Sequence, residues 1–432
     1  MSLASLAERP TIYALSSGRP PAAISVIRIS GSRAHEAGEQ IAGSLPEPRT
    51  AVVRELRDPA SAELLDESLV LRFDTPASST GEDVVEFQCH GGRAVVDAVL
   101  RVLGSIDGLR EALPGEFTRR AFENGRIDLT EAEGLADLIE AETESQRKTA
   151  LAVAEGGLRR QIEAWQDQLL SFSARAERAI DYDEEDEAID PALLGDCAAL
   201  ATDLKSWLER PRAEPLKDGV RIVVAGPPNT GKSSLLNAIA GQERAIVTDV
   251  PGTTRDHIEV PLALSGIPVL LTDTAGLRNT EDRVEAIGVS RAEALVEAAD
   301  ILLWLGDPGN APSHPRLIRV HAKADLPERK AVPAESIAVS VITGEGPKRL
   351  LERVAELAKS LLPGEGAIVL NRRQAQHIAE AADALGAAAM AAELVIVAEN
   401  LRHARSAFDR LTGRAGVEDV LDALFSRFCL GK

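Results

Sequence analysis

The first stretch of the chain, as far as about residue 123, alternates short runs of β-branched residues with turn-forming residues. Three of these runs predict strands, at Ala23–Ile29, Glu67–Phe73 and Asp83–Gln88. The segment Arg93–Leu103 predicts a helix. Strands and helices in this mixture predict an α+β fold with a mostly antiparallel sheet.

A long segment without proline follows, from Asn124 to Ile189, and its abundant Ala, Glu, Leu, Arg and Gln all favour helix. We expect at least two long helices here, because apolar residues recur at helical spacing: Leu135, Leu138, Ile139, Leu158, Ile162, Trp165 and Leu169. The end of the chain, Ala367–Lys432, is helical again. Its last helix carries one apolar stripe: Val417, Val420, Leu421, Leu424, Phe425 and Phe428.

A different pattern separates the two helical regions. After a proline-containing linker, Pro211–Lys217, a buried strand (Gly219–Ala225) enters a glycine-rich loop, and strands and helices then alternate to about Leu362. This order is typical of a doubly wound, parallel-type sheet with helices on both faces. We expect a multi-domain chain: an α+β domain at 1–123, a helical part at 124–214, an inserted α/β domain at 215–366 and a second helical part at 367–432.

The composition fits a soluble globular protein of several domains, with 432 residues, 44% of them apolar and 27% charged. Three cysteines are too few to staple such a chain, which favours a reducing compartment. The sequence predicts neither a secretory signal nor a membrane span, so we expect a cytoplasmic protein. The formal net charge of −20 argues against a surface that wraps nucleic acid directly.

A phosphate-binding loop lies between the predicted strand and a predicted helix at Ser234–Ala240. Residues 226–233, Gly-Pro-Pro-Asn-Thr-Gly-Lys-Ser, match the pattern G-x-x-x-x-G-K-[ST]. In such a loop, backbone N–H groups surround phosphate oxygens, the lysine reaches the β- and γ-phosphates, and the Ser233 hydroxyl ligates Mg²⁺. We assign these residues to the nucleotide: Asn229, Thr230, Gly231, Lys232, Ser233 and Ser234.

Two further motifs complete a γ-phosphate site. The sequence Asp-Thr-Ala-Gly at 273–276 follows an apolar strand, Pro268–Thr272, and places a carboxylate where it can support Mg²⁺. The loop at 249–256 supplies threonines of the kind that sense the γ-phosphate. We assign these residues to the nucleotide: Thr248, Asp249, Val250, Pro251, Gly252, Thr253, Thr254, Asp273, Thr274, Ala275 and Gly276.

Selection of the base is assigned to two loops near the end of the inserted domain. Lys323-Ala-Asp325 resembles the N-K-x-D guanine box of GTPases, in which the aspartate accepts hydrogen bonds from guanine. Ala322 stands where asparagine is usual, which removes about one hydrogen bond, ~1 kcal/mol. Asp325 keeps the preference for guanine over adenine, so we expect weak to moderate GTP affinity. Ser340 and Val341 fit the loop behind the base.

Beyond these motifs, the chain resembles the MnmE (TrmE) family of tRNA modification GTPases nearly from end to end. The similar segments outside the nucleotide motifs are Ser25–Gly31, Thr80–Gly92, Pro114–Leu129 and the terminal Cys-Leu-Gly-Lys. The resemblance implies that the N-terminal domain binds a tetrahydrofolate derivative (5,10-methylene- or 5-formyl-) at a dimer interface. The matching contact residues are Arg28, Glu86, Arg126 and Lys432, of which Arg126 is often lysine in the family. It also implies that Cys429 takes part in the modification chemistry.

The resemblance further implies how GTP is hydrolysed. Leu277 stands where Ras-like proteins carry the glutamine that orients the attacking water. In the family, G domains pair face to face and bind K⁺ in place of an arginine finger, and Glu285 matches the glutamate that positions the water. The matching metal ligands are Asn229, Thr248, Val250 and Thr253 for K⁺, and Ser233 and Thr254 for Mg²⁺.

The implied function is GTP-driven addition of an aminomethyl or carboxymethylaminomethyl group to C5 of the wobble uridine of certain tRNAs. The family acts as a homodimer with a flavoprotein partner, MnmG (GidA), to which much of the tRNA contact is left. The G domain alone also allows a ribosome-assembly or regulatory GTPase of the Era/Der kind, and the N-terminal segments and the C-terminal Cys-Leu-Gly-Lys favour the MnmE family over it. A second alternative is a nucleotide-using enzyme of another class, such as a P-loop kinase. The Asp-Thr-Ala-Gly sequence at 273–276 and Lys323-Ala-Asp325 argue against that alternative.

Overall fold

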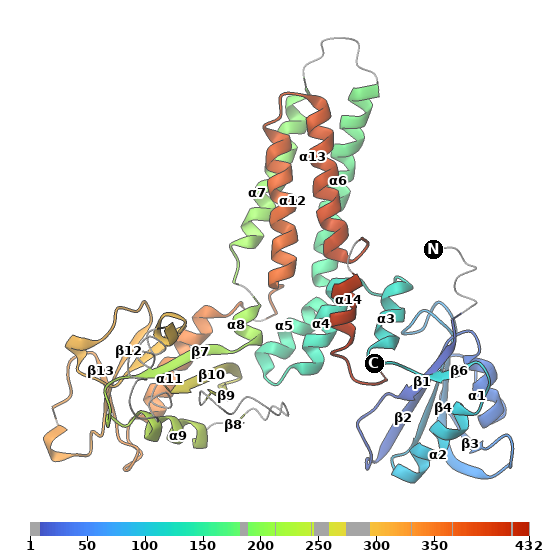
Figure 1. The fold of residues 1–432 in the computed structure, drawn as a ribbon, viewed down its shortest axis with the longest axis horizontal. Coiled ribbons are helices and arrows are strands. Elements are labelled where there is room, and N and C mark those ends of the chain that lie inside the picture. The colour runs from blue at the N-terminus through green and yellow to red at the C-terminus, as the bar shows by residue number, and fades with distance from the viewer. Residues whose placement is uncertain are drawn as a thin grey trace, which may run out of the picture. The chain divides into compact units, whose positions relative to one another are not determined.

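The structure, a computed structural model, describes residues 9–181, 189–211, 213–242, 244–245, 259–273, 294–329, 331–364, 366–415 and 418–431. Contacts divide the chain into two compact units, Met1–Ala136 with Thr412–Lys432, and Asp137–Leu411. The elements of the N-terminal part, labelled as in Figure 1, are β1 (Thr11–Leu15), β2 (Ile24–Ser30), α1 (Ala34–Ala42), β3 (Val52–Arg57), β4 (Leu64–Phe73), β5 (Val84–His90), α2 (Arg93–Gly104), β6 (Leu109–Glu111) and α3 (Glu116–Glu123).

Helices and a second set of strands make up the rest of the described chain. The helices before the second sheet are α4 (Leu129–Glu140), α5 (Glu144–Ala154), α6 (Gly157–Asp181), α7 (Pro191–Leu208) and α8 (Glu214–Lys217). The α/β elements are β7 (Val220–Ala225), α9 (Lys232–Gln242), β8 (Arg244–Ala245), β9 (Glu259–Leu264), β10 (Ile267–Asp273), β11 (Ile301–Trp304), β12 (Leu317–Ala322), β13 (Ser336–Val339) and α11 (Pro347–Leu361). The final helices are α12 (Arg372–Ala389), α13 (Leu394–Thr412) and α14 (Glu418–Phe425).

The first unit is built on a six-stranded sheet in the order β3-β4-β5-β2-β1-β6. Among these described strands, β1 and β6 pair in parallel and all other neighbours are antiparallel, so the predicted α+β fold is confirmed. Helices α1 and α2 cover one face, where Ile27, Val70 and Phe87 are completely buried. This core determines which side chains remain on the opposite face.

The opposite face of this sheet carries polar residues that the sequence singled out. Side chains alternate between the faces of a strand, so Arg28 and Glu86, directly paired across β2 and β5, point away from the core under α1 and α2. Ala14 pairs with Arg28 from the other side and extends this row onto β1. Helix α3 covers the β1 end of the face, because Phe117 is buried with Ile12 and Ala14.

The helical part of the second unit is a bundle in which α6, α7, α12 and α13 lie side by side (Figure 1). Trp165 of α6 is completely buried at its centre, with its ring 5.3 Å from that of Trp207 and 6.1 Å from that of Phe408. Its indole N–H donates to the Asp203 carboxylate at 2.7 Å, so this buried polar group is satisfied. Although the bundle helices are long, none of those described is apolar enough to cross a bilayer.

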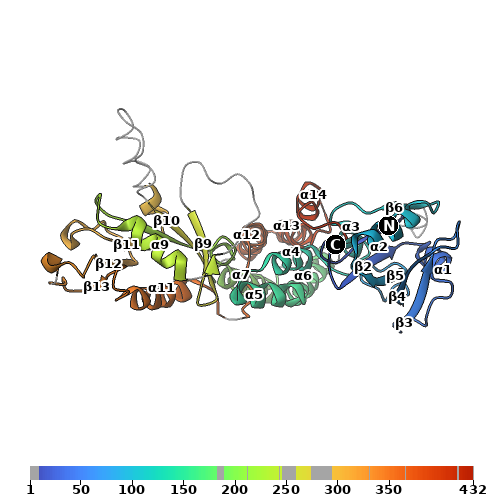
Figure 2. The same cartoon turned by 90° about the horizontal axis from the view of Figure 1, so that it is seen from below.

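The α/β part of the second unit contains a sheet whose described strands follow the order β13-β12-β11-β7-β10-β9-β8. Strands β13 to β10 are parallel, whereas β9 and β8 add antiparallel pairs at one edge. Helices α9 and α11 pack along one face (Figure 2), and residues around 295–299 cover the other. In such a sheet, ligands bind beyond the carboxyl ends of the parallel strands.

Two details differ from the sequence predictions. Pro211–Lys217, predicted to be a linker, ends in the short helix α8, whose Leu216 is buried in the core of the second sheet. Val417, the first residue of the predicted apolar stripe, lies outside the described residues. The described part of the stripe does not lie on a single helix, since α14 ends at Phe425 while Phe428 beyond it is still only 5% exposed. In both cases the side chain is buried against residues that are distant in the sequence. A local pattern contains no information about such contacts.

Candidate functional site

The phosphate-binding loop begins where β7 ends, and α9 starts within it at Lys232. Lys232 is buried, and its ammonium group donates to the backbone carbonyls of Gly226 and Pro227, at 2.9 Å each. Asn229 and Gly231 have φ angles of 60° and 102°, and these turns curl the backbone into a concave loop. The loop and the helix N-terminus together suit a phosphate group.

Two of the predicted magnesium-supporting residues meet at this edge of the sheet. Strand β10 runs parallel to β7, which places Asp273 at its carboxyl end beside the loop. The Ser233 hydroxyl donates to the Asp273 carboxylate at 2.7 Å. A hydroxyl and a carboxylate oxygen are hard ligands of the kind that Mg²⁺ takes beside nucleotide phosphates. The pair therefore fits the metal that the sequence led us to expect.

The predicted base-binding residues follow β12 and β13 at the same edge. The Ser340 hydroxyl donates to the Asp325 carboxylate at 2.6 Å and so orients it. Lys323 has a φ of 58° and donates to the Asn229 carbonyl at 2.7 Å, which connects the base-binding loop to the phosphate-binding loop. Ala322 is 6% exposed and offers no polar side-chain group. Val341 beside Ser340 is 41% exposed.

The remaining nucleotide residues divide into two groups. Thr230 donates from its hydroxyl to the Pro227 carbonyl at 2.9 Å, and Ser234 is exposed on α9. Other predicted residues lie outside the part of the chain that the structure describes: Thr248, Asp249, Val250, Pro251, Gly252, Thr253, Thr254, Thr274, Ala275, Gly276, Glu285 and Lys432.

Arg28 and Glu86 form an ion pair on the sheet face that α1 and α2 leave open. The Arg28 Nε–H donates to the Glu86 carboxylate at 2.8 Å, and the side chains are 24% and 15% exposed. The Arg28 guanidinium also lies 5.6 Å from the centre of the Phe117 ring. A partly sheltered guanidinium and carboxylate, each with further hydrogen-bonding atoms, can hold a polar ligand.

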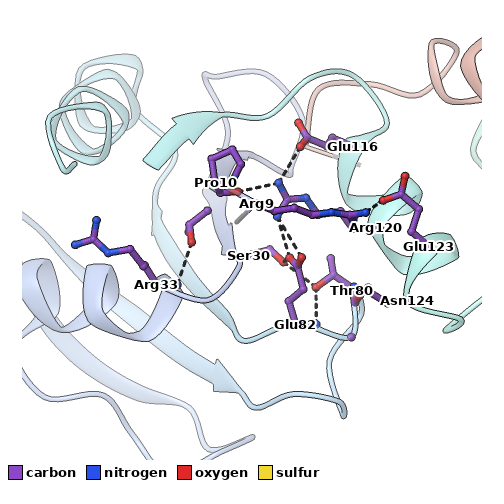
Figure 3. Close-up of polar contacts among 12 residues, drawn as sticks. Arg9, Pro10, Ser30, Arg33, Thr80, Glu82, Glu116, Arg120, Glu123 and Asn124 are labelled. Atoms are coloured by element: carbon purple, nitrogen blue, oxygen red, sulfur yellow. Dashed lines mark hydrogen bonds and ion pairs between the residues drawn. The ribbon is translucent and has the colours of Figure 1, made fainter. Parts of the chain in front are cut away.

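A buried network joins α3 to the turn before β5 (Figure 3). Arg120, whose side chain is 4% exposed, donates to the Glu82 carboxylate at 3.1 Å and to Glu116 at 2.9 Å. Ser30, two residues along β2 from Arg28, donates to Glu82 at 2.7 Å. Removing one partner of such a buried pair costs about 3–5 kcal/mol, because the other charge is left uncompensated. The sequence pattern gave no indication of this network.

Glu116 is held ionised in this network. Burial raises the pKa of its carboxyl, but hydrogen bonds from Arg110, the Leu113 N–H and Arg120 outweigh burial and hold the pKa below its usual value. Arg110 lies 2.6 Å from Glu116. A lowered folded-state pKa means that this stabilisation is present at neutral pH and is lost as the pH falls through the folded-state value.

Arg126 is placed by the same turn. The Asn124 side-chain amide donates to the Thr80 carbonyl at 2.7 Å, and the Arg126 N–H donates to the Ala121 carbonyl at 2.8 Å. Gly81 has a φ of 78°, and a Cβ there would lie 3.2 Å from Cγ of Arg126, so the arginine stem packs over the glycine. The turn at 80–82 therefore links Arg126 to the strand that carries Arg28.

Outside the nucleotide loop, the described residues bring together one group with the side-chain types of a metal site. Ligand atoms of His35, Asp74 and Asp83 lie within 4.8 Å of one another. Asp74 is already paired with Arg72 at 2.7 Å, and Asp83 accepts the Thr75 N–H at 2.9 Å. The guanidinium already neutralises the carboxylate that a cation would use, so we assign no metal to this group.

Cys429 is exposed, whereas the other two free cysteines, Cys89 and Cys197, are buried. Burial raises the pKa of the Cys89 and Cys197 thiols to about 11. Buried thiols of this kind are unreactive, because the thiolate is the nucleophile. Cys429 is therefore the cysteine with access to a substrate.

Family models and known relatives match nearly the whole chain. The MnmE helical domain model matches residues 129–429, and the model for the GTP-binding protein TrmE N-terminus matches residues 11–126. The tRNA modification GTPases MnmE of Erythrobacter litoralis and Zymomonas mobilis subsp. mobilis are each 51% identical to this chain, covering 98% of it and 100% of their own length. The solved G domain of the T. maritima FeoB iron transporter is 25% identical, with 32% of this chain and 98% of that chain covered and a TM-score of 0.25.

Proposed function

Since the chain belongs to the MnmE family of tRNA modification GTPases, we propose that it transfers a one-carbon unit from a tetrahydrofolate derivative to tRNA. The product is an aminomethyl or carboxymethylaminomethyl group on C5 of the wobble uridine of certain tRNAs. The observation that carries the proposal is the 51% identity over 98% of the chain, because this agreement extends far beyond the nucleotide-binding part of the chain. As a member of the family, the chain is a GTPase that binds GTP with Mg²⁺.

The phosphate-binding loop provides the residues for GTP hydrolysis. Lys232 would hold the β- and γ-phosphates, and Ser233 and Asp273 would hold Mg²⁺, together with Thr254. We assign K⁺ to Asn229, Thr248, Val250 and Thr253, between two G domains paired face to face. Glu285 would position the attacking water, since Leu277 has no group that can do so. The exposure of Asn229 on the loop supports a ligand role, because its amide is accessible from outside the domain.

The open face of the first sheet provides the residues for the folate. When bound, a 5,10-methylene- or 5-formyl-tetrahydrofolate supplies the one-carbon unit. The Glu86 carboxylate suits paired hydrogen bonds from the aminopyrimidine edge of the pterin, and Arg28, Arg126 and Lys432 suit the carboxylates of the glutamate tail. The partial exposure of Arg28 and Glu86 supports this assignment, since both retain atoms that a ligand can reach.

Apolar side chains on the same face support a homodimer. Four residues on neighbouring strands form one row across this face, in the order Val53, Leu69, Gln88 and Val26, each paired with the next. Val53 is 54% exposed, and Ile24 on the same face is 57% exposed. Exposed apolar residues gathered on one sheet face are typical of an interaction surface. The flavoprotein MnmG (GidA) would be the second partner, in the cytoplasm, and would provide much of the tRNA contact.

Deletion of the gene tests the proposed function. We expect the wobble uridines of the affected tRNAs to lose both modified groups, because the proposed reaction is the step that adds them. Mass analysis of tRNA nucleosides from the deletion strain and from a complemented strain measures this loss. Unchanged wobble uridines would contradict the proposal and favour a regulatory or ribosome-assembly GTPase of the Era/Der kind.

Ala322→Asn is expected to raise the affinity for GTP about fivefold, since one restored hydrogen bond contributes ~1 kcal/mol. Ala322 is the last residue of β12 and lies beside the phosphate-binding loop. A Cβ added to Gly231 of that loop would lie 4.0 Å from the Cβ of Ala322. Titration with fluorescent GTP, in competition with ATP, measures the change. Asp325→Asn is the control and should remove the preference for guanine. A wild-type protein that binds ATP and GTP equally would contradict the assignment of Asp325.

A further inference from the structure

The C-terminal tail leaves α14 from a fixed point. Phe425 and Phe428 are 3% and 5% exposed, with ring centres 6.1 Å apart, and the Phe122 ring of α3 lies 6.3 Å from that of Phe425. Gly115 has a φ of 71°, and a Cβ there would lie 2.2 Å from the Phe425 carbonyl oxygen. The residue that precedes α3 and the end of α14 are therefore in close contact, which fixes the first end of the tail.

A second anchor holds the tail three residues after Phe428. The Ser16 hydroxyl donates to the Gly431 carbonyl at 2.8 Å, across a separation of 415 positions in the sequence. Gly431 is buried with a φ of 91°, and a Cβ there would lie 2.1 Å from the Leu15 carbonyl oxygen. Only glycine fits such a close approach of two backbones in this conformation. We call the Ser16–Gly431 contact the latch.

Between the two anchors, the tail presents Cys429, which is exposed, and Leu430, which is 45% exposed. The latch lies at the end of β1, where the Ser16 N–H donates to the Val26 carbonyl at 2.7 Å. Ala14, two residues earlier, pairs directly with Arg28. Strand residues rise ~3.3 Å each and neighbouring strands lie ~4.8 Å apart, so the Ser16 backbone is roughly 8 Å from the Arg28 backbone.

We propose that Ser16 and Gly431 are positioning residues, and that the latch holds Cys429 beside the Arg28–Glu86 pair for the modification reaction. The inference rests on the proposed function, because it takes Cys429 as the reacting thiol and the pair as part of the folate site. Two anchors on either side of an exposed thiol limit where it can move. A tail held only by Phe428 would let the thiol range over the surface.

Variants of the latch separate positioning from folding. Gly431→Ala should release the tail and lower wobble-uridine modification at least tenfold, and Ser16→Ala should lower it about fivefold, as the loss of one hydrogen bond predicts. Ser16→Thr keeps the hydroxyl and should restore modification. Gly43→Ala is the matched control, since Gly43 has a φ of 76° but nothing within 4 Å of an added Cβ. If Gly431→Ala fails to fold, Ser16→Ala carries the test.

Three readouts are compared: modified uridine in a complemented deletion strain, GTP hydrolysis by the purified full chain, and the mobility of a spin label on Cys429. We expect reduced modification and a more mobile label in Gly431→Ala and Ser16→Ala, with unchanged GTP hydrolysis. Full modification with an immobile label in both variants would overturn the positioning role of the latch, while the proposed role of Cys429 would stand. Normal modification in Cys429→Ser would instead overturn the proposed role of the thiol, and the latch with it.

Discussion

Cys429→Ser is expected to abolish modification of the wobble uridine while leaving GTP hydrolysis unchanged. Serine keeps the shape of the side chain, but its hydroxyl does not form the nucleophilic anion near neutral pH that a thiol provides. Cys429 lies in the compact unit formed by both ends of the chain, whereas Lys232, Ser233 and Asp273 lie in the other unit. The substitution therefore removes an exposed thiol without changing any of the nucleotide residues.

The loss is measured by mass analysis of tRNA nucleosides from a deletion strain complemented with the variant. Leu430→Ser is the matched control, because it changes an exposed residue of the same tail and retains the thiol. Alkylation of the purified proteins should label wild type and Leu430→Ser but not Cys429→Ser, since Cys89 and Cys197 are buried. Wild-type levels of modified uridine in Cys429→Ser would show that the thiol has no part in the reaction.

The nucleotide loop was predictable because its geometry is local. A buried strand, eight residues of loop and a helix N-terminus are contiguous in the sequence, and the structure places them as β7, residues 226–233 and the start of α9. The position of Asp273 beside this loop needed only one further fact, that its strand ends next to β7. Parallel neighbouring strands bring their carboxyl ends to one edge, and β7 and β10 follow this rule.

Contacts between distant residues were not predictable in the same way. The buried Arg120–Glu82 pair joins residues 38 positions apart, and the latch joins residues 415 positions apart. Residues of these types also occur on protein surfaces. The adjacent sequence does not distinguish a residue that makes such a long-range contact from one that is exposed to solvent. Ser340 was assigned to the loop behind the base, but its hydrogen bond to Asp325 depends on β12 and β13 lying side by side.

Replacement of K⁺ by Na⁺ at matched ionic strength is expected to slow GTP hydrolysis on the order of 10²–10³-fold. An arginine finger, which places a positive charge at the transferred phosphate, raises the hydrolysis rate about 10³–10⁵-fold. We assign the equivalent charge in this protein to K⁺ held by Asn229. The rate in K⁺ should also rise with protein concentration, because the site that we propose is completed only when two G domains pair. Phosphate release measured in both salts over a range of protein concentrations tests both expectations.

Asn229→Gly tests the assignment of the ligand. Asn229 has a φ of 60° and its backbone carbonyl accepts a hydrogen bond from Lys323, and glycine can keep both features while losing the side-chain amide. We therefore expect the variant to bind nucleotide but to hydrolyse GTP in K⁺ at a rate close to that of the wild type in Na⁺. Equal wild-type rates in the two salts would exclude the cation mechanism. A variant that still responds fully to K⁺ would mean that other residues hold the ion, because the Asn229 amide is the group that the substitution removes.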